Sequence, residues 1–380
     1  MSQSKPKPLR MALTTPPTVQ KGRGAASNMQ GRFELLAREH FDDGWIDESQ
    51  AEEGQPPLRT QVIMEQAKSI LTRNGSPDVP FNVSLNPYRG CEHGCIYCFA
   101  RPTHSYLGLS PGMDFESRIY AKTNAAQLLR QALSKKNYVP ESIAIGVNTD
   151  AYQPVERKLG ITRQVLEVLH AARHPLAMIT KSSLIERDID LLAEMAQRRQ
   201  AAAAVTITTL DPNLSRILEP RAAAPERRLR TIRTLAEAGI PVGVSIAPVI
   251  PFITEPDLER VLQAAVDAGA SSASYIVLRL PWEVSPLFQQ WLQAHFPDRA
   301  ERVMNRVRDM RGGQDYDASF GTRMKGEGLW AELVAQRFER LVRKLGIDRR
   351  ARNFGGLDFS QFAPPPVEKP DDASGQMPLF

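Results

Sequence analysis

The order of strand-like and helix-like segments restricts this 380-residue chain to a small set of folds. Six short apolar segments with strand character are each followed by a segment with helical periodicity. Strands that alternate with helices pair in parallel through right-handed crossovers. Six units are fewer than the eight of a closed barrel, so the pattern predicts an open six-stranded barrel or a flat doubly wound sheet. We expect the strands at residues 81–85, 142–148, 176–180, 203–208, 241–247 and 274–278.

Differences in composition along the chain predict four parts, of which the alternating strands and helices form one. Residues 1–60 form a largely disordered or docking N-terminal arm, because their first half is rich in Pro, Lys, Gln, Gly and Ser. Residues 61–297 form the core, and residues 298–355 add a helical extension whose clearest helix is 329–345. Residues 356–380 are a flexible tail that begins near three consecutive prolines. Helices of the core are expected at 124–136, 162–173, 185–199, 226–238, 255–268 and 284–295.

All cysteines of the chain lie in one window of eight residues, at Cys91, Cys95 and Cys98. Their odd number and local spacing argue against a disulfide framework. Three thiolates on one short loop can hold three corners of a [4Fe–4S] cluster, which normally takes four cysteines, and they leave one iron open to another ligand. A zinc site completed by His93 or His104 is the alternative, because three cysteines and one histidine are a known zinc set.

The run from residue 86 to residue 101, NPYRGCEHGCIYCFAR, resembles the cluster loop of radical S-adenosylmethionine (SAM) enzymes. Within that family it looks most like the branch of spore photoproduct lyase and the DNA repair photolyase-like proteins. The resemblance implies a partial (β/α)6 TIM-like barrel, a [4Fe–4S] cluster and SAM as cofactors, and a reductant such as flavodoxin or ferredoxin. It also implies reductive cleavage of SAM to a 5′-deoxyadenosyl radical, which abstracts hydrogen from a substrate.

Polar residues collect at the carboxyl ends of the expected strands, where parallel α/β barrels place their chemistry. Asn148, Asp150 and Glu156 follow the second strand, Lys181 follows the third, and Thr206 lies on the fourth. The amino group of SAM requires acceptors and its carboxylate requires a cation and hydroxyl groups, which these residue types supply. The alternatives are helix capping by the two carboxylates and a solvated loop lysine.

The resemblance assigns further roles near the cysteines. It implies that Lys181 contacts the SAM carboxylate, that Thr206 replaces a serine that helps to bind SAM, and that Tyr97 lies near the adenine. Plain core packing is the alternative for Tyr97. Spore photoproduct lyase returns hydrogen through a cysteine outside its cluster loop, and this chain has no such cysteine. A tyrosine is the remaining relay, with Tyr275 preferred among the candidates Tyr88, Tyr106, Tyr152 and Tyr275.

Charge gives a modest indication of an anionic partner such as nucleic acid. The formal net charge is +5 and the isoelectric point is about 9.1. Two arginine-rich stretches could bind phosphates, although ordinary solvated helix faces have the same composition. A peptide or metabolite substrate remains an alternative, as does a non-catalytic protein that binds metal through its three cysteines. The two stretches contain Arg221, Arg227, Arg228, Arg230 and Arg233, and Arg337, Arg340, Arg343, Lys344, Arg349, Arg350 and Arg352.

The last five residues predict a partner of their own. Gln376, Leu379 and Phe380 resemble the peptide by which bacterial replication and repair proteins bind the DNA sliding clamp, although Met377 and Pro378 depart from its consensus. The sequence has no apolar run of the roughly 20 residues that a membrane helix needs. Its first residues show no signal peptide. We therefore expect a cytoplasmic protein.

Overall fold

The fold is built on a seven-stranded sheet in the order β10-β9-β8-β7-β6-β3-β2. The structure, a computed structural model, describes residues 22–34, 58–347 and 356–366. The strands from β3 to β10 pair in parallel, and β2 adds an antiparallel edge. This order follows the chain without reversal, which is the arrangement of an open barrel and not of a doubly wound sheet. The strands are β2 (Leu71–Arg73), β3 (Val83–Leu85), β6 (Ile143–Ile145), β7 (Leu176–Thr180), β8 (Ala201–Thr206), β9 (Val242–Val249) and β10 (Ser272–Val277).

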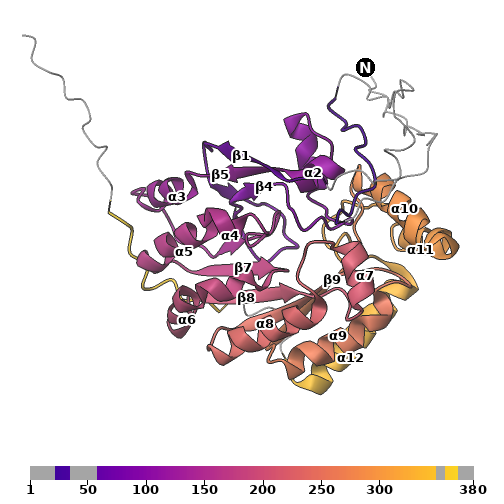
Figure 1. Ribbon diagram of the computed structural model, residues 1–380. Helices are drawn as coiled ribbons and strands as arrows, with labels where there is room; N and C mark the ends of the chain where they lie inside the picture. Colours follow the sequence, from indigo (N-terminus) through magenta and orange to yellow (C-terminus); the bar gives the residue numbers. More distant parts are fainter. Residues whose placement is uncertain (1–21, 35–57, 348–355, 367–380) are drawn as a thin grey trace, which may run out of the picture.

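Helices cover the outer side of this curved sheet, and the six predicted strand–helix units are all present (Figure 1). Helix α12 packs beside α9, which brings the helical extension back onto the barrel. The helices of the barrel are α3 (Ala125–Leu133), α4 (Glu156–Leu159), α5 (Ile161–Ala171), η2 (Ser183–Asp188), α6 (Ile189–Gln197), α7 (Pro212–Leu218), α8 (Pro225–Glu237), η3 (Glu255–Asp257), α9 (Leu258–Asp267) and α10 (Val284–His295). The extension adds α11 (Pro297–Asp309) and α12 (Gly328–Leu345).

A second, three-stranded sheet lies beside the barrel and was not predicted from the sequence. Its strands are β1 (Gln61–Glu65), β5 (Arg118–Lys122) and β4 (Tyr88–Arg89), in the order β1-β5-β4. Strand β1 is largely exposed and β4 has only two residues, so neither has the alternating pattern that identifies a strand. The sheet matters for the site because β4 ends just before the first cysteine. Two short helices, η1 (Arg101–Leu107) and α2 (Met113–Ser117), connect the cysteine loop to β5.

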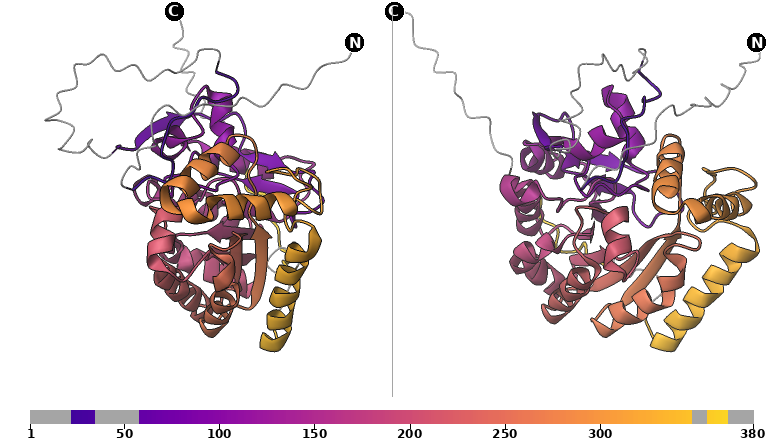
Figure 2. Two further views of the ribbon diagram at one scale, coloured as in Figure 1. Left: turned by 90° about the vertical axis from the view of Figure 1, so that its right-hand side faces the viewer. Right: turned by 45° about the vertical axis from the view of Figure 1, so that its right-hand side comes forward.

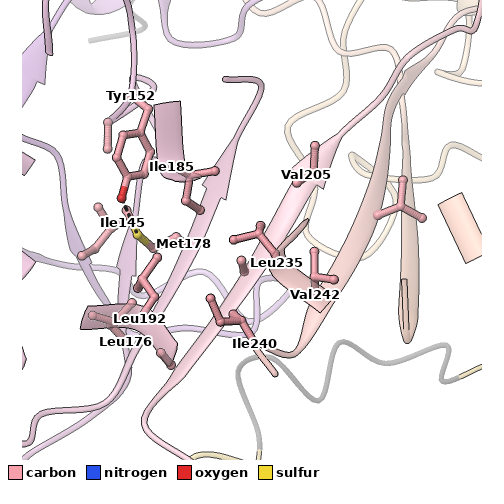
Figure 3. Packing of buried hydrophobic residues seen from close by; sticks show 14 of the residues in the cluster. Ile145, Tyr152, Leu176, Met178, Ile185, Leu192, Val205, Leu235, Ile240 and Val242 are labelled. Atoms are coloured by element: carbon pink, nitrogen blue, oxygen red, sulfur yellow. Dashed lines mark hydrogen bonds between the residues drawn. The ribbon is translucent and has the colours of Figure 1, made fainter. Parts of the chain in front are cut away.

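Two apolar cores hold these parts together. The main core lies between the sheet and its helices, where Met178, Val205 and Val242 of three successive strands meet helical side chains such as Leu235 (Figure 3). The second core contains Ile96 of the cysteine loop, which packs with residues of α7, α10, α11 and the segment 22–34. Figure 2 shows α10 and α11 beside the N-terminal segment at this end of the molecule. The cysteine loop therefore has an apolar support of its own.

Residues 356–366 pack against the amino-terminal end of the barrel. The ring of Phe362 lies 5.4 Å from the ring of His174 and 5.6 Å from that of Tyr138. The buried imidazole of His174 is 2.7 Å from the Tyr138 hydroxyl and 2.9 Å from the Pro175 carbonyl. Among the residues that the structure describes, no helix is long and apolar enough to cross a membrane.

The buried histidine predicts a pH dependence of stability. Burial lowers the pKa of His174 from 6.5 to about 4, so the unfolded chain binds a proton that the folded protein excludes. The neutral His174 therefore contributes at most about 3 kcal/mol to the free energy of unfolding, a contribution that is complete above pH 6.5 and is lost as the pH falls toward 4. Urea unfolding between pH 7 and 4 should show this decline, with a smaller slope in His174→Gln. Part of the slope remains, because burial also lowers the pKa of His104 to about 4.

His170→Gln is the matched control, because His170 lies half-buried on the outer side of α5 and pairs with Glu194 at 2.8 Å. This variant should keep the slope of the unmodified protein. An unchanged slope in His174→Gln would contradict the assignment to His174.

Candidate metal and cofactor site

The three cysteines lie on one loop that leaves β4 toward the carboxyl ends of the parallel strands. Cys91 and Cys95 are buried, Cys98 is half-buried, and all three are free thiols. The Cys91 amide donates to the carbonyl of Phe115 at 2.9 Å, and the Ile96 amide donates to that of Leu218 at 3.1 Å. These bonds fix the loop to α2 on one side and to α7 on the other.

A buried ion pair between Arg101 and Glu116 holds the cysteine loop from behind. Both side chains have no exposed surface. Arg101 also donates to the carbonyls of Cys95 at 2.9 Å and Gly94 at 3.1 Å, and to that of Gly112 at 2.9 Å. A charge buried in this way is stable only with its partner, and removal of one partner typically lowers the free energy of unfolding by about 3–5 kcal/mol. Sequence reasoning missed Glu116, which no local pattern marks.

The N-terminal segment 22–34 completes this support. Both carboxylate oxygens of Glu116 accept hydrogen bonds from the segment, one from the Gly24 amide and one from the Ala25 amide, each at 2.9 Å. The buried Arg23 donates to the Glu116 carbonyl at 2.7 Å. The backbone of Gly24 lies so close to the loop that a Cβ there would be 1.9 Å from the carbonyl oxygen of Gly94. Only glycine fits at this crossing.

Asp150 ties the second and third strand ends to the cysteine loop. Its carboxylate accepts from the Thr180 hydroxyl and the Lys181 amide, both at 2.7 Å, and lies 3.3 Å from His93 Nδ1. Burial alone would raise the pKa of Asp150, but His93 and these hydrogen bonds outweigh it and lower the pKa to about 2. Burial raises the pKa of the Cys91 thiol, and the backbone of Asp150 opposes this rise in part. The carboxylate is thus ionised and faces the loop, as part of its framework.

A second polar network lies beside Cys95. The Tyr97 hydroxyl donates to Glu219, which also pairs with Arg228 at 2.5 Å. The Lys181 ammonium lies 5.9 Å from the centre of the Tyr97 ring. Burial alone would lower the pKa of Lys181, but Cys95 and Glu219 outweigh it and raise the pKa. In turn, burial raises the pKa of Cys95 to about 12 although Lys181 opposes this. The lysine is therefore a cation held next to the thiols.

The remaining predicted ligands are divided between the site and the scaffold. Thr206 is buried at the end of β8, and its carbonyl accepts from Arg228 at 3.0 Å. Asn148 is exposed, and its backbone N–H donates to the side-chain oxygen of Asn86 at 3.0 Å. Glu156 is fully buried, where it accepts from Tyr88 and from the Thr162 amide and pairs with Arg187 at 2.7 Å. This last network joins β4, α5 and η2 and does not include the cysteines.

The two histidines of the zinc alternative have protein partners. His93 faces Asp150, and His104 Nε2 lies 3.0 Å from the carbonyl of Arg118. In the part of the chain that the structure describes, no three His, Cys, Asp or Glu side chains form a group that could hold a single metal ion such as zinc. A [4Fe–4S] cluster differs, because each of its cysteines binds a different iron.

The candidate relay tyrosines lie in four different surroundings. Tyr88 and Tyr152 are buried and bonded to the carboxylates of Glu156 and Asp188. The preferred candidate, Tyr275, packs with its ring 4.8 Å from that of Phe338 on α12, in the outer helical layer. Tyr106 is exposed on η1.

Several arginines of the two predicted basic stretches pair within the chain. Arg227 pairs with Glu186 at 2.6 Å, and Arg228 is buried against Glu219. Arg221 pairs with Glu92 at 2.9 Å. Arg337 pairs with Glu255 and, at 2.6 Å, with Glu259. Arg349, Arg350 and Arg352 lie outside the described residues.

Comparison with known proteins now identifies the domain that carries this site. Residues 85–265 match the sequence model of the radical SAM superfamily. They include the cysteine loop, the last residue of β3 and the whole of the parallel strands β6, β7, β8 and β9. These residues are therefore a radical SAM domain by their similarity to that superfamily. The members of this superfamily use a [4Fe–4S] cluster and SAM.

The chain is also similar in sequence to two uncharacterized proteins and in fold to a solved structure. An uncharacterized protein of Mycobacterium tuberculosis is 37% identical over 226 residues, which are 59% of this chain and 66% of that protein. The alignment thus spans just under two thirds of that relative. An uncharacterized protein of Methanocaldococcus jannaschii is 26% identical over 66% of this chain and 89% of its own length. Spore photoproduct lyase complexed with dinucleoside spore photoproduct has the same fold, with a TM-score of 0.52 at 13% identity over 75% of this chain and 79% of that one.

The donor set of the site fits such cofactors. Thr208 Oγ1, buried after β8, has no hydrogen-bond partner among the described residues. Buried polar groups are nearly always satisfied, so this hydroxyl is suited to a polar ligand. Together with the Lys181 cation and three free thiols it provides the chemistry that a metal cluster and a zwitterionic cofactor require.

The close crossing at Gly24 generates a prediction about the loop support. Gly24→Ala places a Cβ against the Gly94 carbonyl, so the segment 22–34 should leave its site or distort the loop. We expect faster cleavage of this segment in limited proteolysis and a loss of about 1–3 kcal/mol of unfolding free energy. Gly75→Ala is the control, because a Cβ there meets nothing within 4 Å. Unchanged protection in Gly24→Ala would contradict the close approach.

Proposed function

We propose that Cys91, Cys95 and Cys98 hold a [4Fe–4S] cluster, that SAM binds beside it, and that the protein cleaves SAM reductively to act on nucleic acid. The observation that carries the proposal is the position of three free thiols on one buried loop, next to Lys181 and Asp150 at the carboxyl ends of parallel strands. When bound, the cluster supplies one electron to the SAM sulfonium, which yields methionine and a 5′-deoxyadenosyl radical.

The protein's own residues prepare the site for this chemistry. Lys181 places a positive charge beside Cys95, where it favours the thiolate form that binds iron and can pair with a carboxylate. Thr206 and Thr208 lie at the end of β8, and the free hydroxyl of Thr208 is a donor for a bound ligand. Tyr97 presents its ring beside Lys181, as a face for a planar group such as adenine. Asp150 helps to keep the cysteine loop in place through its contact with His93.

Nucleic acid is the substrate class that we favour. The chain has a formal net charge of +5, and a protein of the same fold was solved with a dinucleoside lesion bound. A peptide or a metabolite is the alternative substrate, and a non-catalytic metal protein is the alternative role. The chain offers no fourth cysteine for hydrogen return, so a repair cycle of the spore photoproduct lyase type is not part of the proposal.

Anaerobic reconstitution tests the proposal directly. The protein should take up about four irons and four sulfides per chain and, with a strong reductant, convert SAM to 5′-deoxyadenosine. Replacing the three cysteines by alanine should abolish both properties. His93→Gln is the informative control. A zinc site of three cysteines and this histidine would bind zinc more weakly in the variant, whereas the cluster should retain its iron. Zinc without iron, or iron without SAM cleavage, would contradict the enzymatic role.

Other partners belong to the same proposal. Flavodoxin or ferredoxin would deliver the electron in the cytoplasm, where thiols stay reduced. The tail residues Gln376, Leu379 and Phe380, which lie outside the described residues, would bind the DNA sliding clamp. A labelled peptide of the tail should bind purified clamp, and a peptide with Leu379 and Phe380 replaced by alanine should not. Absence of binding at high micromolar concentration would exclude this contact.

A further inference from the structure

The exposed aromatic side chains of the described residues share an unusual neighbour. They are Phe33, Phe99, Tyr106, Trp282 and Phe320, with exposed fractions from 42% to 69%. Each ring has an arginine guanidinium within 6 Å of its centre. Large exposed rings are costly to keep in water, so a group of them that is paired with arginines indicates a binding surface.

Arg32 is the centre of the main group. Its guanidinium lies 4.0 Å from the Trp282 ring, 5.2 Å from the Phe33 ring and 5.7 Å from the Tyr106 ring. Phe33 and Tyr106 also contact each other, with their ring centres 4.8 Å apart. Glu283 fixes this arrangement by pairing with Arg32 at 3.4 Å and by accepting from the Ser105 hydroxyl at 3.4 Å. Three rings from three distant parts of the chain are therefore held around one cation.

Trp282 is held in position by its backbone as well. Its φ angle is +47°, in the left-handed region that bulky residues rarely adopt. Such strain costs about 1–3 kcal/mol and tends to persist where the local geometry serves a function. The side chain is nevertheless 63% exposed, so burial of the ring does not compensate for the strain. This combination favours a recognition role for the indole.

A second group begins at the cysteine loop. Phe99 directly follows Cys98, and Arg279 lies 5.2 Å from its ring. Arg279 donates to the Tyr316 hydroxyl at 3.3 Å. Among the described residues it makes no ion pair, and its buried Nε has no hydrogen-bond partner. Because Arg279 and Trp282 are only three residues apart, the two groups are neighbours. We call Arg32, Phe33, Phe99, Tyr106, Arg279 and Trp282 the arginine–aromatic surface.

The composition of this surface distinguishes between possible partners. The exposed large aliphatic side chains, among them Met64 on β1 and Leu329 on α12, lie on other elements. Rings and arginines also occur at protein interfaces, so nucleic acid is favoured here by the arginine that has no carboxylate partner among the described residues and by the proposed nucleic-acid target. Flat rings and guanidinium groups match the faces of unstacked bases, and an arginine without a carboxylate partner matches a phosphate. Base stacking tolerates any sequence, because every base presents a π-face.

We propose that the arginine–aromatic surface binds single-stranded nucleic acid, with bases stacked on Trp282, Tyr106 and Phe99 and a phosphate at Arg279. The proposal rests on the nucleic-acid target of the proposed function. It gives this target a binding surface that begins at Phe99, one residue after Cys98. A base on Phe99 would lie at the edge of the cysteine loop. The surface would thus hold a strand in which one nucleotide is presented to the site.

Binding of a labelled single-stranded oligodeoxynucleotide, followed by fluorescence anisotropy with the full-length protein, tests this assignment. Trp282→Ala and Tyr106→Ala should each weaken binding about tenfold, the size expected for loss of one stacked base. Trp282→Phe should restore most of the affinity, because it keeps a ring. Arg279→Gln should reduce the dependence of log K on log salt by about 0.7. Leu329→Ala, at an exposed position of α12, is the matched control and should bind as the unmodified protein does.

The possible failures are distinguishable. If Trp282→Ala and Tyr106→Ala bind as tightly as the unmodified protein, the surface is wrong, but the nucleic-acid target stands. If the unmodified protein binds neither the oligodeoxynucleotide nor an oligoribonucleotide of the same sequence, both the surface and the nucleic-acid target are wrong. SAM cleavage in the reconstituted enzyme would then still support the radical chemistry. Equal binding of the matching duplex, unaffected by the two substitutions, would overturn the stacking of unpaired bases.

Discussion

The shape of the cysteine loop depends on the buried ion pair between Arg101 and Glu116. Neither side chain reaches solvent. The arginine satisfies carbonyl groups of the loop, and the carboxylate satisfies amides of the N-terminal segment, at Gly24 and Ala25. One interaction therefore fixes two segments that are distant in sequence. Because the protein's own groups satisfy these charges, the loop does not need bound metal to define its backbone, which is how a site is preorganised for its cofactor.

The sequence predicted the barrel because each strand–helix unit leaves a local signal. An apolar strand followed by an amphipathic helix is visible within about 30 residues, and the strands then pair in chain order. The cysteine spacing is equally local. Glu116 could not be found in this way, since its partner Gly24 is 92 positions away and a single glutamate forms no pattern. The two-residue β4 and the exposed β1 were missed because periodicity requires several alternating residues.

Side-chain partners were harder to predict than positions. Asp150 and Glu156 both follow the second parallel strand, where a carboxylate suits a cofactor amine and a structural hydrogen bond equally well. The structure directs Asp150 toward the cysteine loop and Glu156 toward Tyr88, Thr162 and Arg187. Both side chains are buried, so the choice between partners is made by tertiary contacts that the local sequence does not encode.

Arginines illustrate the same point for molecular recognition. A count of positive charges favours the stretch around Arg227, but that guanidinium and its neighbour Arg228 are neutralised by Glu186 and Glu219. A paired, partly buried arginine has little attraction left for a phosphate. Arg279 does not form such a pair in the described residues and belongs to no basic run in the sequence. Recognition of an anion therefore depends on which cations have no carboxylate partner after folding. At the arginine–aromatic surface that cation is Arg279, which lies beside the ring of Phe99.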